Sequence, residues 1–405
     1  MKRREFVKAA AMTPAIAALA GAARPAVAAA PIYNAQAGFT FYSPLADAWY
    51  RSGQFFEWTS TTRNNNGRKA KVFYRTFGDR TRPALVMLHG FPNSSFDYQA
   101  LIPRLEQDYF VSVLDFPGFG FSDKPQDGYS YMLEDDARLA DYFVREVLGL
   151  SRFSLYTHDR GVSVGLAFLG HFLQHGRRPY EIPYHFMSDS GMFLPLANLS
   201  PAQTALLDPV RGPALIAQMR ATPRITAGAP VDVAYADIQA FNDGTGARLH
   251  VGKYQLERAA NEGRWLANLP RSPVPTALLW GMRDTVNPMR IANHVWLTYL
   301  NDREVESSYW LLPGAGHYPQ RDLPEEVSQI VRLCLEGRVP TRQAEAAFMG
   351  NSARNRTPTA PVYVGRVFKT SNTPIRIEGG THFVQESAPE RLTSEILTFL
   401  EARPR

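Results

Sequence analysis

The sequence predicts an α/β fold, a doubly wound and mostly parallel sheet with helices on both faces. Apolar runs typical of strands recur along the chain, and helical patterns separate most of them. Several of these runs are almost continuous stretches of Val, Leu, Ile and Phe, as expected for strands that are covered on both faces. With 405 residues and 45% hydrophobic content, the chain can bury a large core.

The expected strands follow one another at regular intervals. They cover residues 71–77, 84–90, 110–116, 152–157, 184–189, 276–281 and 308–313. A helical pattern spans 134–150, whereas the residues before 71 read as loops. Active sites in such sheets lie at the carboxyl ends of the strands, so the residues that follow each strand are the candidates for chemistry.

One interval interrupts the alternation. Residues 192–272 contain helical patterns and loops but no convincing strand, which predicts a helical cap inserted between two strands of the sheet. We therefore expect the core to consist of residues 31–191 and 273–337, followed by a C-terminal extension over 338–405.

The first 30 residues have the pattern of a targeting segment. Paired arginines in "KRREFVK" precede an apolar, Ala-rich stretch and small residues at 26–30. This pattern resembles a twin-arginine export signal, which carries folded proteins across the bacterial inner membrane. We expect a periplasmic protein with no stable membrane insertion after export.

Charge and cysteine content restrict the partners. The net charge is +6, but the first 28 residues hold five basic side chains and one acidic one, so the remainder carries only about +2 without runs. We expect a small-molecule substrate and no nucleic acid, and the oligomeric state stays open. Cys334 is the only cysteine, so no disulfide within the chain is possible, and its apolar surroundings indicate a core residue.

The stretch "YTHDRGVSVGLAF" (156–168) offers two nucleophiles. Ser163 lies in a literal G-x-S-x-G motif, and Asp159 directly follows the apolar strand 152–157. A nucleophile elbow needs a strand, an exposed residue at a sharp turn, and small neighbours two positions away. Thr157 and Gly161 meet that need around Asp159, whereas the strand before Ser163 would be polar and would end in glycine. We expect Asp159 to be the nucleophile and Ser163 to lie one turn into the next helix.

Five segments together carry a family resemblance. "HGFP" (89–92), "DFPGFGFSDKP" (115–125), "HDRG" (158–161), "WGMRDTVNP" (280–288) and "GHYPQ" (316–320) resemble the α/β-hydrolase family, in the branch of epoxide hydrolases and haloalkane dehalogenases. The cap segments "SDSGMF", "FNDG" and "WLANL" are also similar to mesoderm-specific-transcript-like members. The resemblance spans roughly residues 60–337 and implies an α/β-hydrolase fold with an aspartate nucleophile.

The resemblance also implies a mechanism. Asp159 attacks an electrophilic carbon and forms an alkyl ester, which water then hydrolyses with a histidine as base and an acid to orient it. Backbone N–H groups of Phe91 and Arg160 would form the oxyanion hole. Asp284 matches the family's acid, and Asp189 is a reserve acid because some relatives place it after the earlier strand. We expect His89 to be structural.

Two histidines compete for the base because a segment of the chain is duplicated. Residues 314–337 recur at 379–402, with Gly314, His317, Gln320, Pro324 and Glu325 matched 65 positions later. His317 follows a complete strand, acid and helix series, so we expect it to be the base. His382 follows a shortened series and is expected to belong to a remnant repeat.

Substrate clues from the resemblance are fewer. Haloalkane dehalogenases usually place Trp and Asn at the positions of Arg160 and Phe91. Epoxide hydrolases need cap tyrosines, for which Tyr235 and Tyr254 are the candidates. Arg160 matches enzymes of the fluoroacetate dehalogenase type, where it grips a carboxylate, although Ser163 stands where they carry a second arginine. The alternative for Arg160 is a salt bridge with a cap acid such as Asp237.

We therefore expect an enzyme that needs no metal or organic cofactor. Epoxide hydrolysis to a diol is the first expectation, and hydrolytic dehalogenation of a haloalkane or haloacid is the alternative. An ester hydrolase that uses Ser163, or a non-catalytic binding protein on the same fold, remain open.

Overall fold

The structure is a computed structural model that describes residues 38–125, 128–174 and 179–339, together with residues 390, 393 and 394. The chain divides into two units, Met1–Ala30 and Pro31–Arg405, and all described residues belong to the second. The expected export signal, His382 and most of the C-terminal extension lie outside the described residues. Among the described residues, no helix is both long and apolar enough to cross a membrane.

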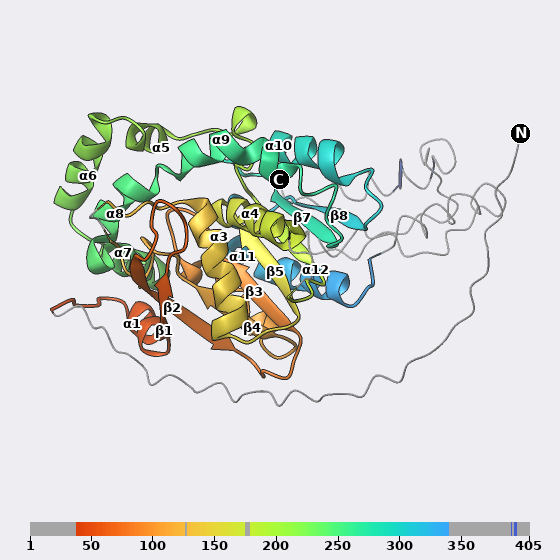
Figure 1. Cartoon of the computed structure of the whole chain (residues 1–405), viewed down its shortest axis with the longest axis horizontal. Helices are drawn as coiled ribbons and strands as arrows, with labels where there is room; N and C mark the ends of the chain where they lie inside the picture. The colour runs from red at the N-terminus through yellow and green to blue at the C-terminus, as the bar shows by residue number, and fades with distance from the viewer. Residues whose placement is uncertain (1–37, 126–127, 175–178, 340–389, 391–392, 395–405) are drawn as a thin grey trace, which may run out of the picture. The chain divides into compact units, whose positions relative to one another are not determined.

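One sheet of eight strands organises the described chain (Figure 1). The strands are β1 (Gln54–Thr59), β2 (Lys69–Phe77), β3 (Ala84–Leu88), β4 (Phe110–Leu114), β5 (Phe153–His158), β6 (His185–Ser188), β7 (Thr276–Gly281) and β8 (Ser307–Leu312). Their order is β1-β2-β4-β3-β5-β6-β7-β8, antiparallel at β1–β2 and β2–β4 and parallel elsewhere. All seven expected strands are present, which confirms the predicted fold class.

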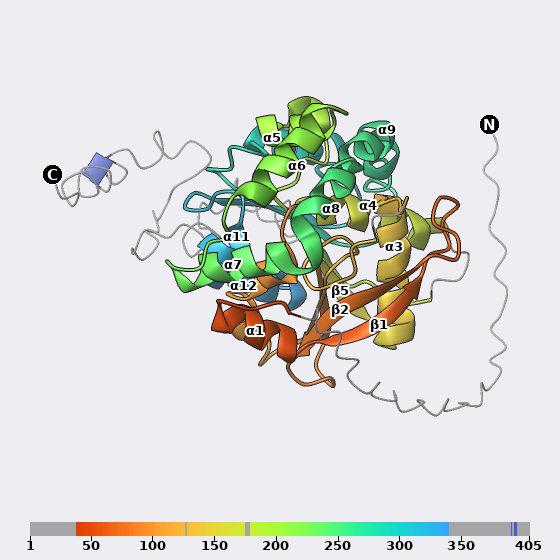
Figure 2. The same ribbon diagram turned by 90° about the vertical axis from the view of Figure 1, so that its left-hand side faces the viewer.

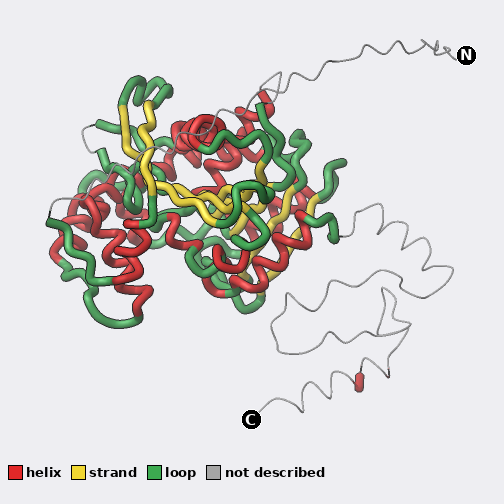
Figure 3. Tube along the Cα trace, turned by 90° about the horizontal axis from the view of Figure 1, so that it is seen from below, coloured by secondary structure: helices red, strands yellow, loops and turns green. Residues whose placement is uncertain are grey.

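Helices cover the sheet on both sides, as the view in Figure 3 shows. They are α1 (Pro44–Arg51), α2 (Ile102–Leu105), α3 (Leu133–Tyr142), α4 (Arg160–Gln174), α5 (Pro201–Leu206), α6 (Arg211–Ala221), α7 (Pro230–Ala240), α8 (Gly244–Val251), α9 (Tyr254–Leu266), α10 (Met289–Val295), α11 (Pro319–Asp322) and α12 (Pro324–Leu335). The expected helix over 134–150 is α3, continued by a π-helical turn at Phe143–Val147.

The segment before residue 71 corrects the expectation of loops, because it contains α1 and β1. Ser43 caps α1 by accepting a hydrogen bond from the N–H of Ala46, and Pro44 begins the helix. The helix then buries Trp49 and Tyr50 against the sheet. β1 is an edge strand with mostly half-exposed or exposed residues, so it lacks the continuous apolar pattern of the central strands.

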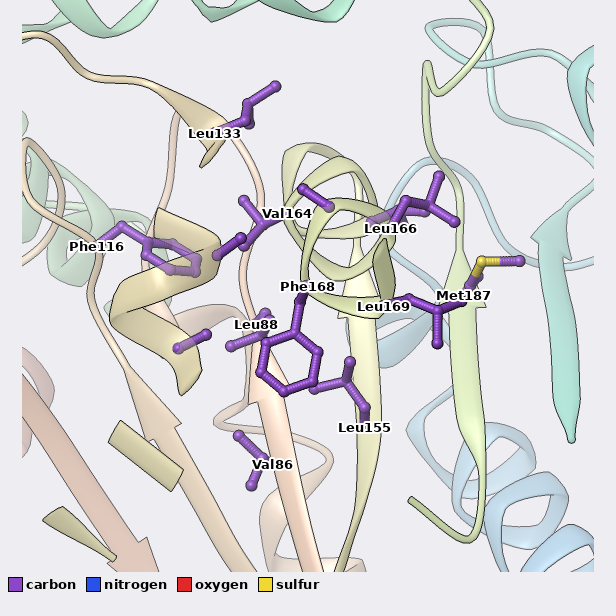
Figure 4. Close-up of a cluster of buried hydrophobic side chains, with 14 of the residues drawn as sticks. Val86, Leu88, Phe116, Leu133, Leu155, Val164, Leu166, Phe168, Leu169 and Met187 are labelled. Atoms are coloured by element: carbon purple, nitrogen blue, oxygen red, sulfur yellow. The ribbon is translucent and has the colours of Figure 1, made fainter. Parts of the chain in front are cut away.

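Alternating side chains of the strands build two cores. In β3, Val86 and Leu88 belong to the core under α3 and α4, whereas Leu85 and Met87 belong to the core under α1, α2 and α12. Figure 4 shows the first core, where Phe168 of α4 points down onto the strands. Burying both faces of the central strands fixes their register, and the register fixes which side chains emerge at their carboxyl ends.

The interval between β6 and β7, all of whose residues are described, holds α5 to α9 and no strand. Figures 1 and 2 show α5, α6, α8 and α9 on one side of the sheet. α9 packs on α4 and contributes Trp265 and Leu266 to the first core, whereas α7 contributes Tyr235 and Ile238 to the second. The inserted helices are thus anchored in both cores, next to the N-terminal part of α4.

Candidate active site

A strained turn joins β5 to α4 at Asp159. The φ of Asp159 is 49°, in the left-handed region that L-residues rarely adopt. Its N–H donates to the carbonyl of Ser188 (3.1 Å), and the Ser190 hydroxyl donates to its carbonyl (2.7 Å). A Cβ on Gly161 would lie 2.3 Å from the carbonyl oxygen of Leu88, so only glycine fits there. The turn therefore has the geometry of a nucleophile elbow, with Asp159 at its tip.

The Asp159 carboxylate is held at both oxygens. Its Oδ1 accepts a hydrogen bond from the backbone N–H of Phe91 (2.8 Å), and its Oδ2 accepts one from Nδ2 of Asn287 (3.4 Å). Burial alone would raise the pKa of Asp159, but the charges of His317 and Arg258 outweigh it and lower the pKa. The carboxylate is therefore ionised at neutral pH, as a nucleophile must be.

His317 stands between two carboxylates. Its Nδ1 donates to Oδ2 of Asp284 (2.9 Å), and its Nε2 lies 3.8 Å from Oδ2 of Asp159. Oδ1 of Asp284 accepts the N–H groups of Val286 (2.8 Å) and Asn287 (2.9 Å), which fixes the carboxylate. Burial alone would lower the pKa of His317. The Asp284 hydrogen bond and the charge of Asp159 outweigh this effect and raise the pKa to about 9. The imidazole is therefore protonated at pH 7 while Asp159 is ionised.

Asp189 lies nearby but has different partners. It is fully buried, and its oxygens accept hydrogen bonds from the N–H of Gly281 (2.9 Å) and the hydroxyl of Ser188 (2.8 Å). Burial and the charge of Asp284 raise the pKa of Asp189 well above its usual range. The structure thus places Asp284, rather than the reserve acid, in contact with His317.

The other expected residues divide between the site and its surroundings. Tyr254 packs against Phe91 with tilted rings, whose centroids lie 5.6 Å apart, and its hydroxyl accepts a hydrogen bond from Gln255 (3.0 Å). Tyr235 instead donates its hydroxyl to Oδ1 of Asp97 (2.8 Å), within the second core. Ser163 lies inside α4, where its Oγ accepts a hydrogen bond from Nε of Arg258 (2.9 Å).

His89 has the structural role expected for it. Its Nδ1 donates to the carbonyl of Gly90 (2.8 Å), and its Nε2 accepts the N–H of Phe116 (3.1 Å). Burial lowers the pKa of His89 to about 3, so the ring is neutral and its tautomer is fixed by these two bonds. It thereby ties the loop that carries Phe91 to the end of β4.

Comparison with known proteins agrees with this geometry. Residues 85–330 match the model of the alpha/beta hydrolase family. The chain belongs to the alpha/beta hydrolase family. It is 31% identical to LipZ of Mycobacterium tuberculosis over 71% of this chain and 96% of that protein. It is 29% identical to the mesoderm-specific transcript homolog protein of Bos taurus (70% and 85% covered). With haloalkane dehalogenase 2 of Mycobacterium bovis the identity is 27% (62% and 87% covered).

Solved structures support the fold of this hydrolase. Haloalkane dehalogenase DbeA from Bradyrhizobium elkani matches with a TM-score of 0.56 and 20% identity, covering 73% of this chain and 99% of that one. A thermophilic esterase from Thermogutta terrifontis matches with a TM-score of 0.52 and 21% identity, covering 70% and 98%. Because these two proteins carry different activities on the same architecture, the fold alone does not assign a substrate.

Arg160 of the hydrolase is buried next to Asp159 in the chain. One of its terminal nitrogens donates to Oδ2 of Asp136 on α3, and its guanidinium lies 5.1 to 5.6 Å from the ring centroids of Phe116, Phe119 and Tyr254. Its salt bridge is therefore to an acid of the core rather than to the cap acid Asp237. Asp237 instead accepts the N–H groups of residues 42 and 43 and pairs with Arg224.

Sequence reasoning missed two residues that contact the site. Asn287 belongs to "WGMRDTVNP", the segment that contains Asp284, so its position shortly after Asp284 could have identified it as a site residue. Arg258 lies on α9 of the cap, 95 positions from its partner Ser163, and nothing in its local sequence marks it. Among the described residues, no cluster of three or more His, Cys, Asp or Glu side chains is arranged to hold a metal ion.

Proposed function

We propose that this protein is a hydrolase that acts through a covalent alkyl ester on Asp159, and that it opens epoxides to diols. The observation that carries the proposal is the environment of the Asp159 carboxylate. One oxygen is held by the Phe91 N–H, and the other faces Nε2 of His317 at 3.8 Å. One oxygen is thus placed for attack on carbon, and the carboxyl carbon is placed for later attack by water.

In the first half-reaction, Oδ2 of Asp159 attacks a ring carbon of the epoxide and the bond from that carbon to the ring oxygen breaks. The ring oxygen takes a proton from the hydroxyl of Tyr254, the cap tyrosine that packs against Phe91. Protonated His317 then returns a proton to Tyr254. Its pKa falls at this stage because the esterified Asp159 no longer carries a negative charge.

In the second half-reaction, neutral His317 takes a proton from water, and the resulting hydroxide attacks the carboxyl carbon of Asp159. The negative charge that develops on Oδ1 is stabilised by the Phe91 N–H, together with the N–H of Arg160. The ester bond to the diol breaks, and the departing oxygen takes the proton from His317. The carboxyl group of Asp159, which now holds one oxygen from water, then returns its proton to His317, so that both groups regain their initial charges.

Hydrolytic dehalogenation is the second candidate, and the similarity to haloalkane dehalogenase 2 favours it. The chemistry differs only in the first half-reaction, where Oδ2 attacks a carbon that bears a halogen and the halide leaves with the bonding electrons. The second half-reaction is the same. An ester hydrolase based on Ser163 would instead need Ser163, which now accepts a hydrogen bond from Arg258, to reach a base.

The deciding experiment uses isotopically labelled water. Purified full-length chain in excess over an epoxide or haloalkane, in ¹⁸O water, is expected to give unlabelled alcohol oxygen from the first turnover and label in Asp159. Asp159→Asn should lose product formation by at least about 10³-fold, whereas Asp189→Asn should retain it. Label that enters the product directly, or activity that survives Asp159→Asn, would overturn the aspartate mechanism and leave Ser163 as the candidate nucleophile.

We also propose that residues 1–30 direct export to the periplasm. The support is the paired arginines, the apolar stretch and the small residues that follow it. Replacing Arg3 and Arg4 by lysine should leave the protein in the cytoplasm, which cell fractionation would show. Export of the double variant at the original level would contradict the proposal.

A further inference from the structure

Arg258 on α9 is a buried cation without a carboxylate beside it. Its side chain is 1% exposed, and within the described chain no Asp or Glu oxygen lies within 4.0 Å of it. Its Nε donates to Ser163, and its buried Nη2 has no hydrogen-bond partner among the described residues. Burying a guanidinium with no carboxylate within 4.0 Å is costly, and the Tyr254 ring, whose centroid lies 4.8 Å from it, offsets only part of that cost.

The guanidinium lies beside the nucleophile. Ser163, which holds its Nε, is one helical turn after Asp159. A Cβ on Gly191 would lie 2.9 Å from Nη1 of Arg258 and 3.0 Å from Oδ1 of Asn287, whose amide nitrogen in turn reaches Oδ2 of Asp159 at 3.4 Å. The absence of a side chain at position 191 therefore leaves the room in which Arg258 approaches the carboxylate.

The charge of Arg258 acts on two carboxylates. It is one of the influences that lower the pKa of Asp159, and it opposes the rise that burial causes in the pKa of Glu262. Once Asp159 becomes an ester, its negative charge is gone and the buried guanidinium loses part of its compensation. An anionic group on the substrate, next to the reacting carbon, would compensate it throughout the reaction.

We propose that Arg258 binds a carboxylate group of the substrate, and that the natural substrates are therefore acids, namely epoxy acids or halo acids. This inference rests on the proposed function and adds the substrate class. A guanidinium matches a carboxylate in shape and charge, and Nη2 is a free donor for it. Arg160 lies nearby and also has two buried donors without partners among the described residues, Nε and Nη1, but it already forms an ion pair with Asp136, whereas Arg258 has no carboxylate within 4.0 Å.

The test compares acids with their neutral amides, which have nearly the same shape. The two pairs are oxirane-2-carboxylate with oxirane-2-carboxamide, and chloroacetate with chloroacetamide. We expect the wild type to prefer the acid of its reactive pair. Arg258→Met should lower kcat/KM for the acid by about 10²-fold, mainly through KM, and the loss for the amide should be at least about tenfold smaller than the loss for the acid.

Two further variants complete the design. Arg264→Met removes another arginine of α9, one whose side chain is 55% exposed. It should leave kcat/KM unchanged for both the acid and the amide. Arg258→Lys keeps the charge and protects the test if Arg258→Met does not fold. It should lower kcat/KM for the acid by about tenfold and lower it less for the amide, because lysine keeps the charge but lacks the fork of donors. An equal loss on acid and amide would overturn the inference and leave Arg258 as a counterion of Asp159.

Failure of the proposed function gives a different result. If the wild type makes no product from any of the four compounds, the covalent mechanism on these substrates fails, and binding of propanoate measured by calorimetry then tests Arg258 alone. Binding that Arg258→Lys weakens about tenfold and Arg264→Met leaves intact would support the carboxylate site. Propanoate binding that is absent, or equal in the wild type and Arg258→Lys, would contradict it.

Discussion

Nε2 of His317 lies 3.8 Å from Oδ2 of Asp159, while Nδ1 of the same ring donates to Asp284. This arrangement places the histidine between two carboxylates, which in the proposed mechanism are the nucleophile and the orienting acid. It also couples their charges, because the pKa of His317 is raised to about 9 partly by the charge that Asp159 loses on esterification. The predictions below follow from this coupling and from the buried charges around it.

Replacing His317 by Gln should stop the reaction after the first half. Asp159 still carries its Phe91 hydrogen bond, so the ester forms, but no base activates water. We expect one equivalent of covalent adduct per chain and a steady-state rate at least about 10³-fold lower. Intact-mass spectrometry, with the adduct mapped to the peptide of Asp159, checks this. Normal turnover would show that another base, such as His382, serves the ester.

Acid should separate the two half-reactions. The pKa of Asp159 is lowered below its usual value, so the carboxylate stays largely ionised at pH 4 to 5. Hydrolysis of the ester needs neutral His317, whose pKa is below about 9 once Asp159 is esterified, so its rate should rise with pH through that lowered pKa. Rapid-quench experiments should therefore find ester accumulating at pH 4 to 5 and not at pH 8. The same ester fraction at both values would contradict this assignment.

Asp284 and Asp189 provide a matched pair of carboxyl substitutions. Asp284→Asn removes the charge that orients His317, and we expect kcat to fall by about 10² to 10⁴-fold. Asp189→Asn should change kcat by less than about tenfold, because the oxygens of Asp189 accept hydrogen bonds from Gly281 and Ser188 rather than from His317. Steady-state kinetics of both variants checks which substitution causes the larger loss of kcat. The reverse order would make Asp189 the functional acid.

The buried pair of Arg160 and Asp136 should matter for stability. Arg160→Met leaves Asp136 buried without its cation, which is expected to lower the free energy of unfolding by about 3 to 5 kcal/mol. Adding Asp136→Asn should restore part of that loss, since the unpaired charge is removed. Denaturant unfolding of the two single variants and the double variant measures the coupling. Additive losses would mean that the two side chains do not stabilise each other.

Local patterns in the sequence were enough to predict the architecture. The seven expected strands are found with ends shifted by no more than two residues, because strands buried on both faces leave continuous apolar runs. The edge strand β1 was missed because one of its faces is solvated and its pattern is weak. The choice of Asp159 over Ser163 also rested on local information, namely the apolar strand and the small neighbours that a tight turn requires.

The sequence by itself therefore determined the fold class, the elbow and the candidate partners at neighbouring strand ends. Only the tertiary structure decided which acid contacts His317, that Arg160 pairs with Asp136, and that Arg258 comes from the cap to lie beside the nucleophile. The physical reason is that strand and turn formation depend on residues near in the sequence, whereas burial brings together charges from distant segments. The pair of Arg160 and Asp136 follows from the packing of α4 on α3, and the position of Arg258 follows from the packing of α9 on α4, neither of which a local pattern encodes.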